Sequence, residues 1–322
     1  MSPYWGANFF EFFAVLFTRL VHGEVFTPAA DEVQIGVLCL IAVCCGLIGP
    51  FLVLKRMAMF ANSLSHTILL GIAAAYLLLG GGALFDLSHL LLGAFIAALA
   101  TAAFTEGLIK WFRLQEDASI GLVFTFLFAL GIVLVTLFTR DLHIGIEAVM
   151  GNADALQPSD LRISAILAAM NGGAVFLFYR HFQIASFDRS LSQTLGLSSA
   201  FFHFLLLFLA AATCIGAFRA VGVLLVLAFL VGPYLTARLF SHRLKYLLMW
   251  SSLIGAAASL FGVALARHLL SVYDLPLSTG GIVVCSIGLF YAAAILIRKI
   301  NLFTRRNKSD NLGAKSQKRL HV

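Results

Sequence analysis

Long apolar runs separated by short polar stretches dominate the chain. Each run has about 19 to 24 residues, enough to cross roughly 30 Å of hydrocarbon as a helix that rises about 1.5 Å per residue. The predicted spans lie near residues 33–54, 57–80, 87–109, 119–139, 161–179, 199–218, 220–240, 246–267 and 279–297. The pattern therefore predicts an all-α, polytopic membrane protein of about eight to nine transmembrane helices.

The N-terminal stretch 8–22 has a different pattern. A face of Phe and Leu alternates with Glu11, Thr18 and Arg19, which favours a helix that lies in the membrane interface. An additional span is the alternative. We expect three parts: an N-terminal interfacial segment (1–32), a transmembrane domain (33–298) and a basic tail (299–322).

Composition excludes a soluble domain. The chain is 61% hydrophobic and 11% charged with a mean hydropathy of +0.98, whereas soluble domains carry about a quarter charged residues. The net charge of +7 does not indicate a nucleic-acid partner, because most of the 22 Lys and Arg residues lie in alternate short loops and in the tail. This distribution places the loop at Lys55 and the C-terminal tail in the cytoplasm. We expect the tail to be disordered.

Several sequence motifs are absent. The chain has no G-x-x-x-x-G-K-[ST] phosphate loop, so it does not itself hydrolyse ATP. It also lacks the H-E-x-x-H and G-x-S-x-G motifs of intramembrane proteases. No CxxC pair occurs, and all the cysteines fall in apolar runs, where we expect small buried side chains: Cys39, Cys44, Cys45, Cys214 and Cys285.

The strongest chemical signal is an imidazole inside the second predicted span. His66 lies roughly 14 Å along the helix from Lys55 and Arg56, close to the middle of the hydrocarbon core. Asn62 is four residues earlier and shares its helical face. An imidazole nitrogen with an amide oxygen suits zinc, manganese or ferrous ion, and an intramembrane ionisable group indicates function. The alternative is a helix–helix hydrogen bond with no ion.

Two connections have notable patterns. Segment 139–160 is the longest outward-facing loop and forms either an entry vestibule or a plain solvated loop. Segment 180–198 is amphipathic, with Phe187 and Leu195 on one face and Gly196 as a C-terminal stop. A helix of this kind either docks in a groove of another protein or covers its own helix ends.

Three stretches together resemble a known family. LVLKRMAMFANSLSHTILLGIA at 52–73, FDRSLSQTLGLS at 187–198 and AFRAVGVLLVLAFLVGPYLTARLF at 217–240 are similar to the membrane (permease) subunits of ABC importers for zinc, manganese and iron. In those proteins one span reads roughly R-R-M-x-x-x-G-D-x-[LI]-[SA]-H and a later one R-A-V-G-x-L-L-V-x-x-L-x-x-x-P. The resemblance covers most of 33–298.

The resemblance implies roles for individual residues. His66, with Met57 at the start of the motif, would be the metal ligand on the translocation path. Asn62 stands where the family usually has aspartate, so its site should hold a divalent cation more weakly. Either a partner subunit supplies the carboxylate, or this chain is the weaker half of a heterodimer.

The resemblance also marks a coupling helix at about 187–197. Its best-matching residues are Phe187, Asp188, Leu195 and Gly196, which would seat on the ATPase. In the later span, Arg219, Gly222 and Pro233 match.

The implied partners are an ABC ATP-binding subunit, an extracytoplasmic metal-binding protein and a second permease subunit, identical or paralogous. No cofactor is expected to be permanently bound, since the divalent metal (Mn, Zn or Fe) is cargo. The implied location is the bacterial cytoplasmic (inner) membrane. The alternative function is an ion-coupled secondary metal carrier without an ATPase.

Overall fold

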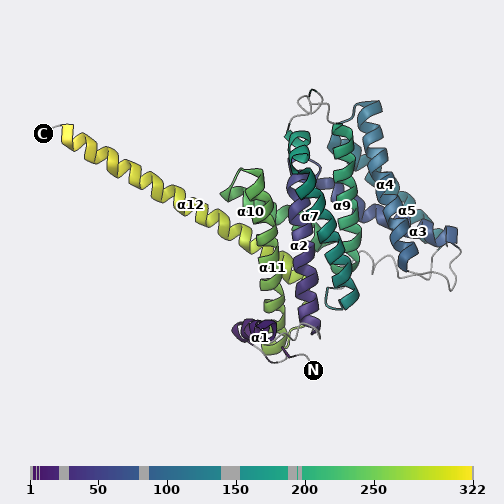
Figure 1. Ribbon diagram of the computed structural model, residues 1–322, viewed down its shortest axis with the longest axis horizontal. Helices are drawn as coiled ribbons and strands as arrows, with labels where there is room; N and C mark the ends of the chain where they lie inside the picture. The colour runs from purple at the N-terminus through teal and green to yellow at the C-terminus, as the bar shows by residue number, and fades with distance from the viewer. Residues whose placement is uncertain are drawn as a thin grey trace.

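The computed structural model describes residues 3–4, 6, 8–21, 29–79, 87–138, 153–187, 194 and 198–320. Nearly all of these described residues lie in helices (Figure 1). The helices are α1 (Phe9–Val21), α2 (Ala30–Leu54), α3 (Ala58–Leu79), α4 (Leu87–Phe112), α5 (Glu116–Phe138), α7 (Pro158–Phe187), α9 (Ser199–Val221), α10 (Val223–Phe240), α11 (Leu244–Tyr273) and α12 (Thr279–Leu320).

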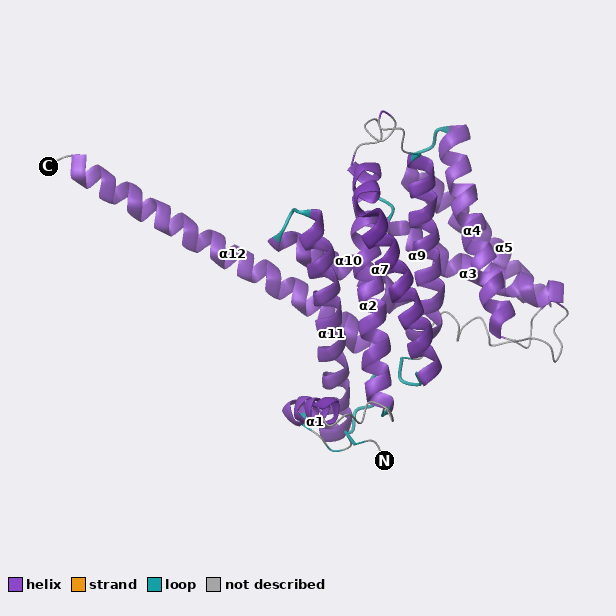
Figure 2. Ribbon diagram, viewed as in Figure 1, coloured by secondary structure: helices purple, strands orange, loops and turns teal. Residues whose placement is uncertain are grey.

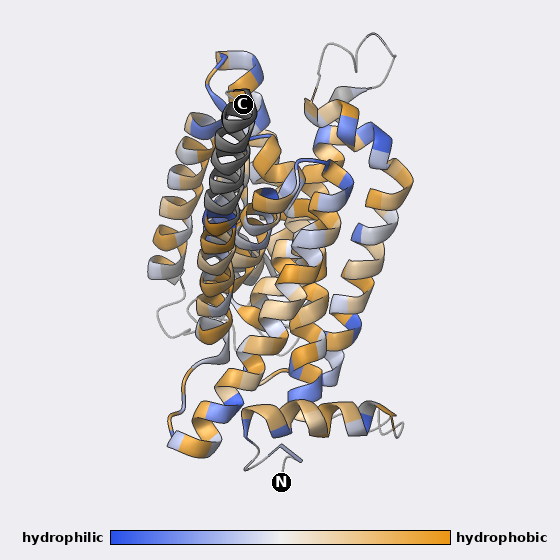
Figure 3. Cartoon of the chain, turned by 90° about the vertical axis from the view of Figure 1, so that its left-hand side faces the viewer, coloured by the Kyte–Doolittle hydropathy of each residue, from blue (hydrophilic) through white to orange (hydrophobic). Residues whose placement is uncertain are grey.

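Length and hydropathy identify the membrane-spanning helices. Within the described residues, eight helices are long and apolar enough to cross a membrane: α2, α4, α5, α7, α9, α10, α11 and α12. Helix α3 has 22 residues and comparable composition, which gives it the same reach. In Figure 3, most of the length of these helices has the colour of apolar residues. The predicted all-α membrane protein of eight to nine spans is confirmed.

Helix α2 is the centre of the bundle and packs against α7, α9, α10 and α11. Its glycines allow this close approach. A methyl group added at Gly46 would lie 2.7 Å from the backbone of Ser252, and one at Gly49 would collide with the carbonyl of Leu230. The Ser251 hydroxyl donates to the Gly46 carbonyl at 2.6 Å. Helices α2 and α11 are therefore fixed together by both shape and hydrogen bonding.

The cysteines follow the packing of their helices. Cys44, Cys45 and Cys214 are buried and Cys39 is half-buried, but Cys285 is exposed. The prediction of a buried Cys285 was wrong because α12 packs on the bundle along one side only, against α10 and α11.

The loops that join α4 to α5 and α10 to α11 lie at the same end of the bundle (Figure 2). We call it the basic end, because Lys55, Lys110 and Arg243 lie there. The turn from α2 to α3 at this end is tight: the amides of Arg56 and Met57 donate back to Val53 and Leu52 at 3.0 and 2.8 Å. Arg56 has φ 61°, the left-handed position of a Schellman motif, where glycine is usual.

A single residue separates α9 from α10. Gly222 ends the first helix and begins the second, with φ 82° and ψ 163°. Only glycine adopts this backbone conformation without strain. The sequence predicted this boundary at residue 219, between spans 199–218 and 220–240, whereas the structure has it at Gly222.

Helix α7 is longer than its predicted span of 161–179. It continues to Phe187 through a kink at Phe178, where φ is −107° and ψ is 19°. The first part of the predicted amphipathic segment 180–198 is consequently an extension of α7.

Helix α1 runs across the bundle at the end opposite to the basic end, as Figure 3 shows. Its 13 residues span only about 20 Å, too short to cross a membrane. Glu32 of α2 holds it by accepting from the Tyr4 hydroxyl at 2.8 Å and the Arg19 guanidinium at 2.5 Å. Burial raises the pKa of Tyr4 above its ordinary value, so its hydroxyl remains a donor.

Helix α12 leaves the bundle and continues through the basic tail to Leu320 (Figure 1). The tail was expected to be disordered, and the structure differs. About half of residues 301–320 are Lys, Arg, Gln, Leu or Ala, which have high helix propensity.

Candidate functional site

The predicted metal ligands lie on α3, which packs between α4 and α5 at one side of the bundle (Figure 1). Small residues bring the three helices close together. A methyl group added at Gly71 would collide with the Gly93 carbonyl of α4 and approach the Ala97 methyl group to 2.7 Å. One added at Gly131 of α5 would lie 3.1 Å from the amide of Leu70. We call α3, α4 and α5 the three-helix wedge.

Asn62 and His66 lie one turn apart on α3, and both side chains are half-buried. The imidazole packs against two rings of α5, with centroid distances of 5.1 Å to Phe124 and 5.0 Å to Phe128. Those two phenyl rings are nearly parallel and 5.8 Å apart. The rings support one side of His66, while its remaining exposure leaves part of the imidazole accessible. Asn62 and His66 thus lie on one face of α3, and their assignment as metal ligands stays a prediction.

Buried hydroxyls line the inside of the same wedge. Thr101 of α4 donates to Thr67 of α3 at 3.0 Å, and both are fully buried. Ser63 of α3, Thr105 of α4 and Ser119 of α5 are also buried, at 2% exposure or less. These buried hydroxyls were not predicted from the sequence, although Thr101 and Thr105 are four residues apart within an apolar run and could have been recognised by that spacing.

Within the described residues, no group of three or more His, Cys, Asp or Glu side chains is placed to hold a metal ion together. Asn62 and His66 thus offer an ion one oxygen and one nitrogen ligand from α3. Transition metals in proteins take about four to six ligands, so this pair suits transient contact with a passing ion better than tight storage.

The predicted coupling helix falls mostly outside the described residues. Asp188, Leu195 and Gly196 lie outside them. Phe187 is the last residue of α7, with 61% of its side chain exposed. Ser198 then caps α9 by accepting from the Phe201 amide at 3.3 Å.

A chain of polar contacts lies beside Phe187 at the basic end. Glu106 of α4 has one carboxylate oxygen 3.0 Å from Lys110 Nζ and the other 3.0 Å from His203 Nε2 of α9. The Nδ1 atom of His203 is 3.4 Å from Lys55 Nζ in the α2–α3 turn. A polar cavity of about 300 Å³ adjoins these groups, and Phe187 lines it.

A second polar cavity, of about 490 Å³, lies at the opposite end. Asp31 and Arg267 form an ion pair in its wall. Asp154, from the predicted vestibule segment, accepts from the Thr279 hydroxyl and from Gln34 Nε2. These contacts join the turn at 153–157 to α2 and to the start of α12. Asp154 therefore has a structural role at this end of the bundle.

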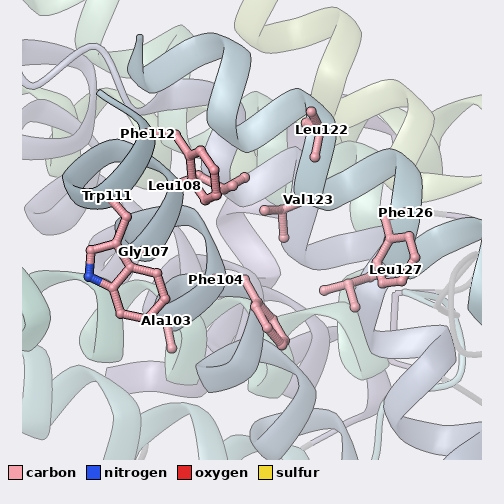
Figure 4. Close-up of a pocket in the computed structure, with 10 residues that line it drawn as sticks. All are labelled: Ala103, Phe104, Gly107, Leu108, Trp111, Phe112, Leu122, Val123, Phe126 and Leu127. Carbon is pink, nitrogen blue, oxygen red and sulfur yellow. The ribbon is translucent and has the colours of Figure 1, made fainter. Parts of the chain in front are cut away.

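An apolar groove of about 470 Å³ runs between α4 and α5 (Figure 4). Its side chains include Phe104, Trp111 and Phe126, which are 59%, 84% and 64% exposed. Only apolar residues and Gly107 line it, so it offers no ligand to a cation. This groove is not the candidate metal site.

Comparison with known proteins identifies the class. Residues 33–298 match the ABC 3 transport family. This chain belongs to the ABC 3 transport family. A metal transport system membrane protein of Chlamydia muridarum (strain MoPn / Nigg) is 38% identical over 312 residues, which cover 95% of this chain and 99% of the relative. The manganese transport system membrane protein MntD of Bacillus subtilis (strain 168) is 33% identical over 287 residues, covering 85% and 94%.

The fold agrees with the ABC 3 transport family. The structure of PsaBC from Streptococcus pneumoniae in complex with Fab aligns with a TM-score of 0.69 and 24% identity, covering 86% of this chain and 95% of that one. The family match over residues 33–298 makes the chain a multi-pass membrane subunit of an ABC transporter. It is not an enzyme, because a separate subunit hydrolyses ATP in this family. The alternative of a secondary carrier without an ATPase is wrong.

Proposed function

We propose that this chain is the permease subunit of an ATP-driven importer that moves a divalent transition metal ion, manganese, zinc or iron, into the cytoplasm. The single observation that carries the proposal is the family match over 33–298, since relatives that cover most of the chain are named for metal and manganese transport. The polar pair on α3 supplies matching chemistry. Mixed nitrogen and oxygen ligands suit all three ions.

Asn62 and His66 are the residues that we assign to the ion path. Both are half-buried on one face of α3, and His66 is supported by two phenyl rings of α5. An importer must release its cargo, so weak, incomplete coordination is an advantage. Because Asn62 carries no charge where the family usually has a carboxylate, we assign further ligands to a second permease subunit, identical or paralogous.

Two other partners complete the transporter. An ABC ATP-binding subunit would contact the segment 187–197, with Phe187, Asp188, Leu195 and Gly196 as its coupling residues. The exposure of Phe187 at the basic end supports this assignment. An extracytoplasmic metal-binding protein would deliver the ion at the opposite end.

The same proposal orients the chain in the bacterial cytoplasmic (inner) membrane. The basic end and the C-terminal tail face the cytoplasm, by the positive-inside rule. Helix α1 lies in the outer interface, where its exposed Phe10 and Phe17 meet lipid. Its contact with α11 and its short length support this placement.

Metal accumulation in cells tests the proposal. Cells that lack the chromosomal copy receive the complete transporter with wild-type or variant chain, and manganese, zinc and iron are measured by elemental analysis. The His66→Ala variant should reach the membrane at the wild-type level and accumulate no more metal than cells without the chain. His242→Ala is the matched control, because it removes an exposed loop imidazole. Normal accumulation by His66→Ala would show that His66 only packs against its neighbours.

A further inference from the structure

The contacts of His203 connect three parts of the chain that are far apart in sequence. Its two ring nitrogens lie 3.0 Å from Glu106 Oε2 on α4 and 3.4 Å from Lys55 Nζ in the α2–α3 turn. We call Lys55, Glu106 and His203 the His203 bridge. Side-chain exposure is 15% for His203 and 11% for Glu106, so the bridge is largely protected from solvent.

A purely structural role does not explain the composition of the bridge. A carboxylate near the end of a membrane helix loses hydration, and well-packed apolar side chains of similar size often stabilise a protein equally well. Lys110, one turn away on the same helix and 3.0 Å from Glu106, already compensates the Glu106 charge. Charge compensation alone therefore does not explain why Glu106 also contacts α9. The connection to α9 is thus the distinctive feature.

The bridge lies between the two functional regions. On one side, His203 is in the second turn of α9, whose cap Ser198 directly follows segment 187–197. On the other side, Lys55 ends α2 in the tight turn that leads into α3. That turn fixes Lys55 relative to the start of α3, the helix that carries Asn62 and His66.

The surroundings allow the bridge to change its arrangement. A polar cavity of about 300 Å³ adjoins it and is lined by Lys55, Glu106, His203 and Phe187, among others. Polar groups beside a cavity of this size have room for water when they separate. The bridge therefore has space beside it into which its side chains can separate.

We propose that Lys55, Glu106 and His203 are positioning residues that transmit a displacement of the start of α9 to α3, and so to Asn62 and His66. The inference rests on the proposed function for the role of these two regions. Loss of the bridge should uncouple ATP hydrolysis from ion movement while leaving both partner subunits bound.

The test uses the complete transporter, purified and reconstituted in liposomes, with manganese uptake and ATP hydrolysis measured on the same sample. For Glu106→Gln and His203→Gln, we expect ATP hydrolysis to continue and the manganese moved per ATP to fall about tenfold, within the range lost when two sites are uncoupled. Glu116→Gln is the matched control, because it removes a carboxylate from the same cavity outside the bridge. It should keep the wild-type ratio.

A double variant separates positioning from general damage. If Glu106 and His203 act as one unit, the Glu106→Gln/His203→Gln variant should be no worse than either single variant. An unchanged ratio in the single variants, or a parallel loss of hydrolysis and uptake, would overturn the inference. Absence of manganese, zinc and iron uptake by the wild-type transporter would instead refute the proposed function.

A second measurement tests the bridge without reference to the cargo. A cysteine introduced as Asn62→Cys is labelled with a water-soluble maleimide, with and without ATP, and its labelling is followed by peptide mass spectrometry. We expect ATP to change the labelling rate in the wild-type background and to leave it unchanged beside Glu106→Gln. An equal response to ATP in both backgrounds would show that α3 moves without the bridge.

Discussion

Replacing Gly71 with alanine tests whether close glycine packing fixes α3 to α4. The added methyl group would collide with the Gly93 carbonyl and lie 2.7 Å from the Ala97 methyl group. Carbon atoms in contact are ordinarily about 3.5 to 4.0 Å apart, so the two helices must separate by about 1 Å. Neither neighbour is a flexible side chain that can rotate away.

The expected magnitude follows from two opposing effects. Overpacking of this kind costs about 1 to 3 kcal/mol, whereas Gly→Ala in a helix gains about 0.5 to 1 kcal/mol. We therefore expect Gly71→Ala to destabilise the protein by about 1 to 2 kcal/mol. Gly121→Ala is the matched control, because a methyl group there meets nothing within 4 Å and should retain only the helix gain.

Thermal unfolding of the purified chain in detergent measures both variants, with tryptophan fluorescence as the signal and size-exclusion chromatography as a check on association. The expected order of midpoints is Gly71→Ala below wild type, and Gly121→Ala equal to or above wild type. A Gly71→Ala midpoint equal to that of Gly121→Ala would refute the close α3–α4 contact. A midpoint lowered equally in both variants would refute it as well.

Three further predictions concern Gly222 between α9 and α10, the N-terminal helix α1 and the candidate metal ligand His66. Gly222→Ala places a side chain at φ 82° and ψ 163° and should destabilise the protein by about 1 to 3 kcal/mol. Gly172→Ala, with open space around it, should not destabilise it. Comparison of the thermal unfolding midpoints of the two variants tests this. Tyr4→Phe removes the 2.8 Å hydrogen bond to Glu32 and should cost about 1 kcal/mol. The loss should appear as faster hydrogen exchange in residues 9–21 but not in α11. Unchanged exchange would contradict a role for this hydrogen bond in holding α1 to the bundle. Metal uptake should fall as the external medium is made acidic, because a protonated imidazole cannot coordinate metal. A flat pH profile of the wild type would argue against His66 as a ligand.

The spans could be predicted from sequence because membrane helices must be long, apolar and internally hydrogen-bonded. The basic residue Lys55 also located the end of α2, whereas the boundary at Gly222 was placed three residues too early. The extent of α7 was harder, since residues 180–187 are amphipathic and read equally well as a separate short helix. In the structure helical backbone runs on to Phe187 and is interrupted only by a kink at Phe178, where φ is −107°.

Only part of the candidate site could be predicted from the sequence. Asn62 and His66 could be predicted as a pair because both lie in one helix, where periodicity alone brings side chains to one face; their role as ligands stays a prediction. The contact of His203 with Glu106 joins residues on α9 and α4, and no local pattern encodes a pairing between distant helices. The support of His66 by Phe124 and Phe128 was missed for the same reason.

Packing and coupling meet in the three-helix wedge. Gly71 and Gly93 bring α3 and α4 into backbone contact, and Gly131 does the same for α3 and α5, so the wedge has little freedom for internal sliding. A displacement delivered to α4 through Glu106, or to the start of α3 through Lys55, is then passed along the helices instead of being absorbed between them. It reaches Asn62 within two turns of Lys55. The same reasoning predicts that Gly71→Ala lowers the metal moved per ATP as well as the stability, because a loosened wedge no longer carries the motion of the basic end to the ligands.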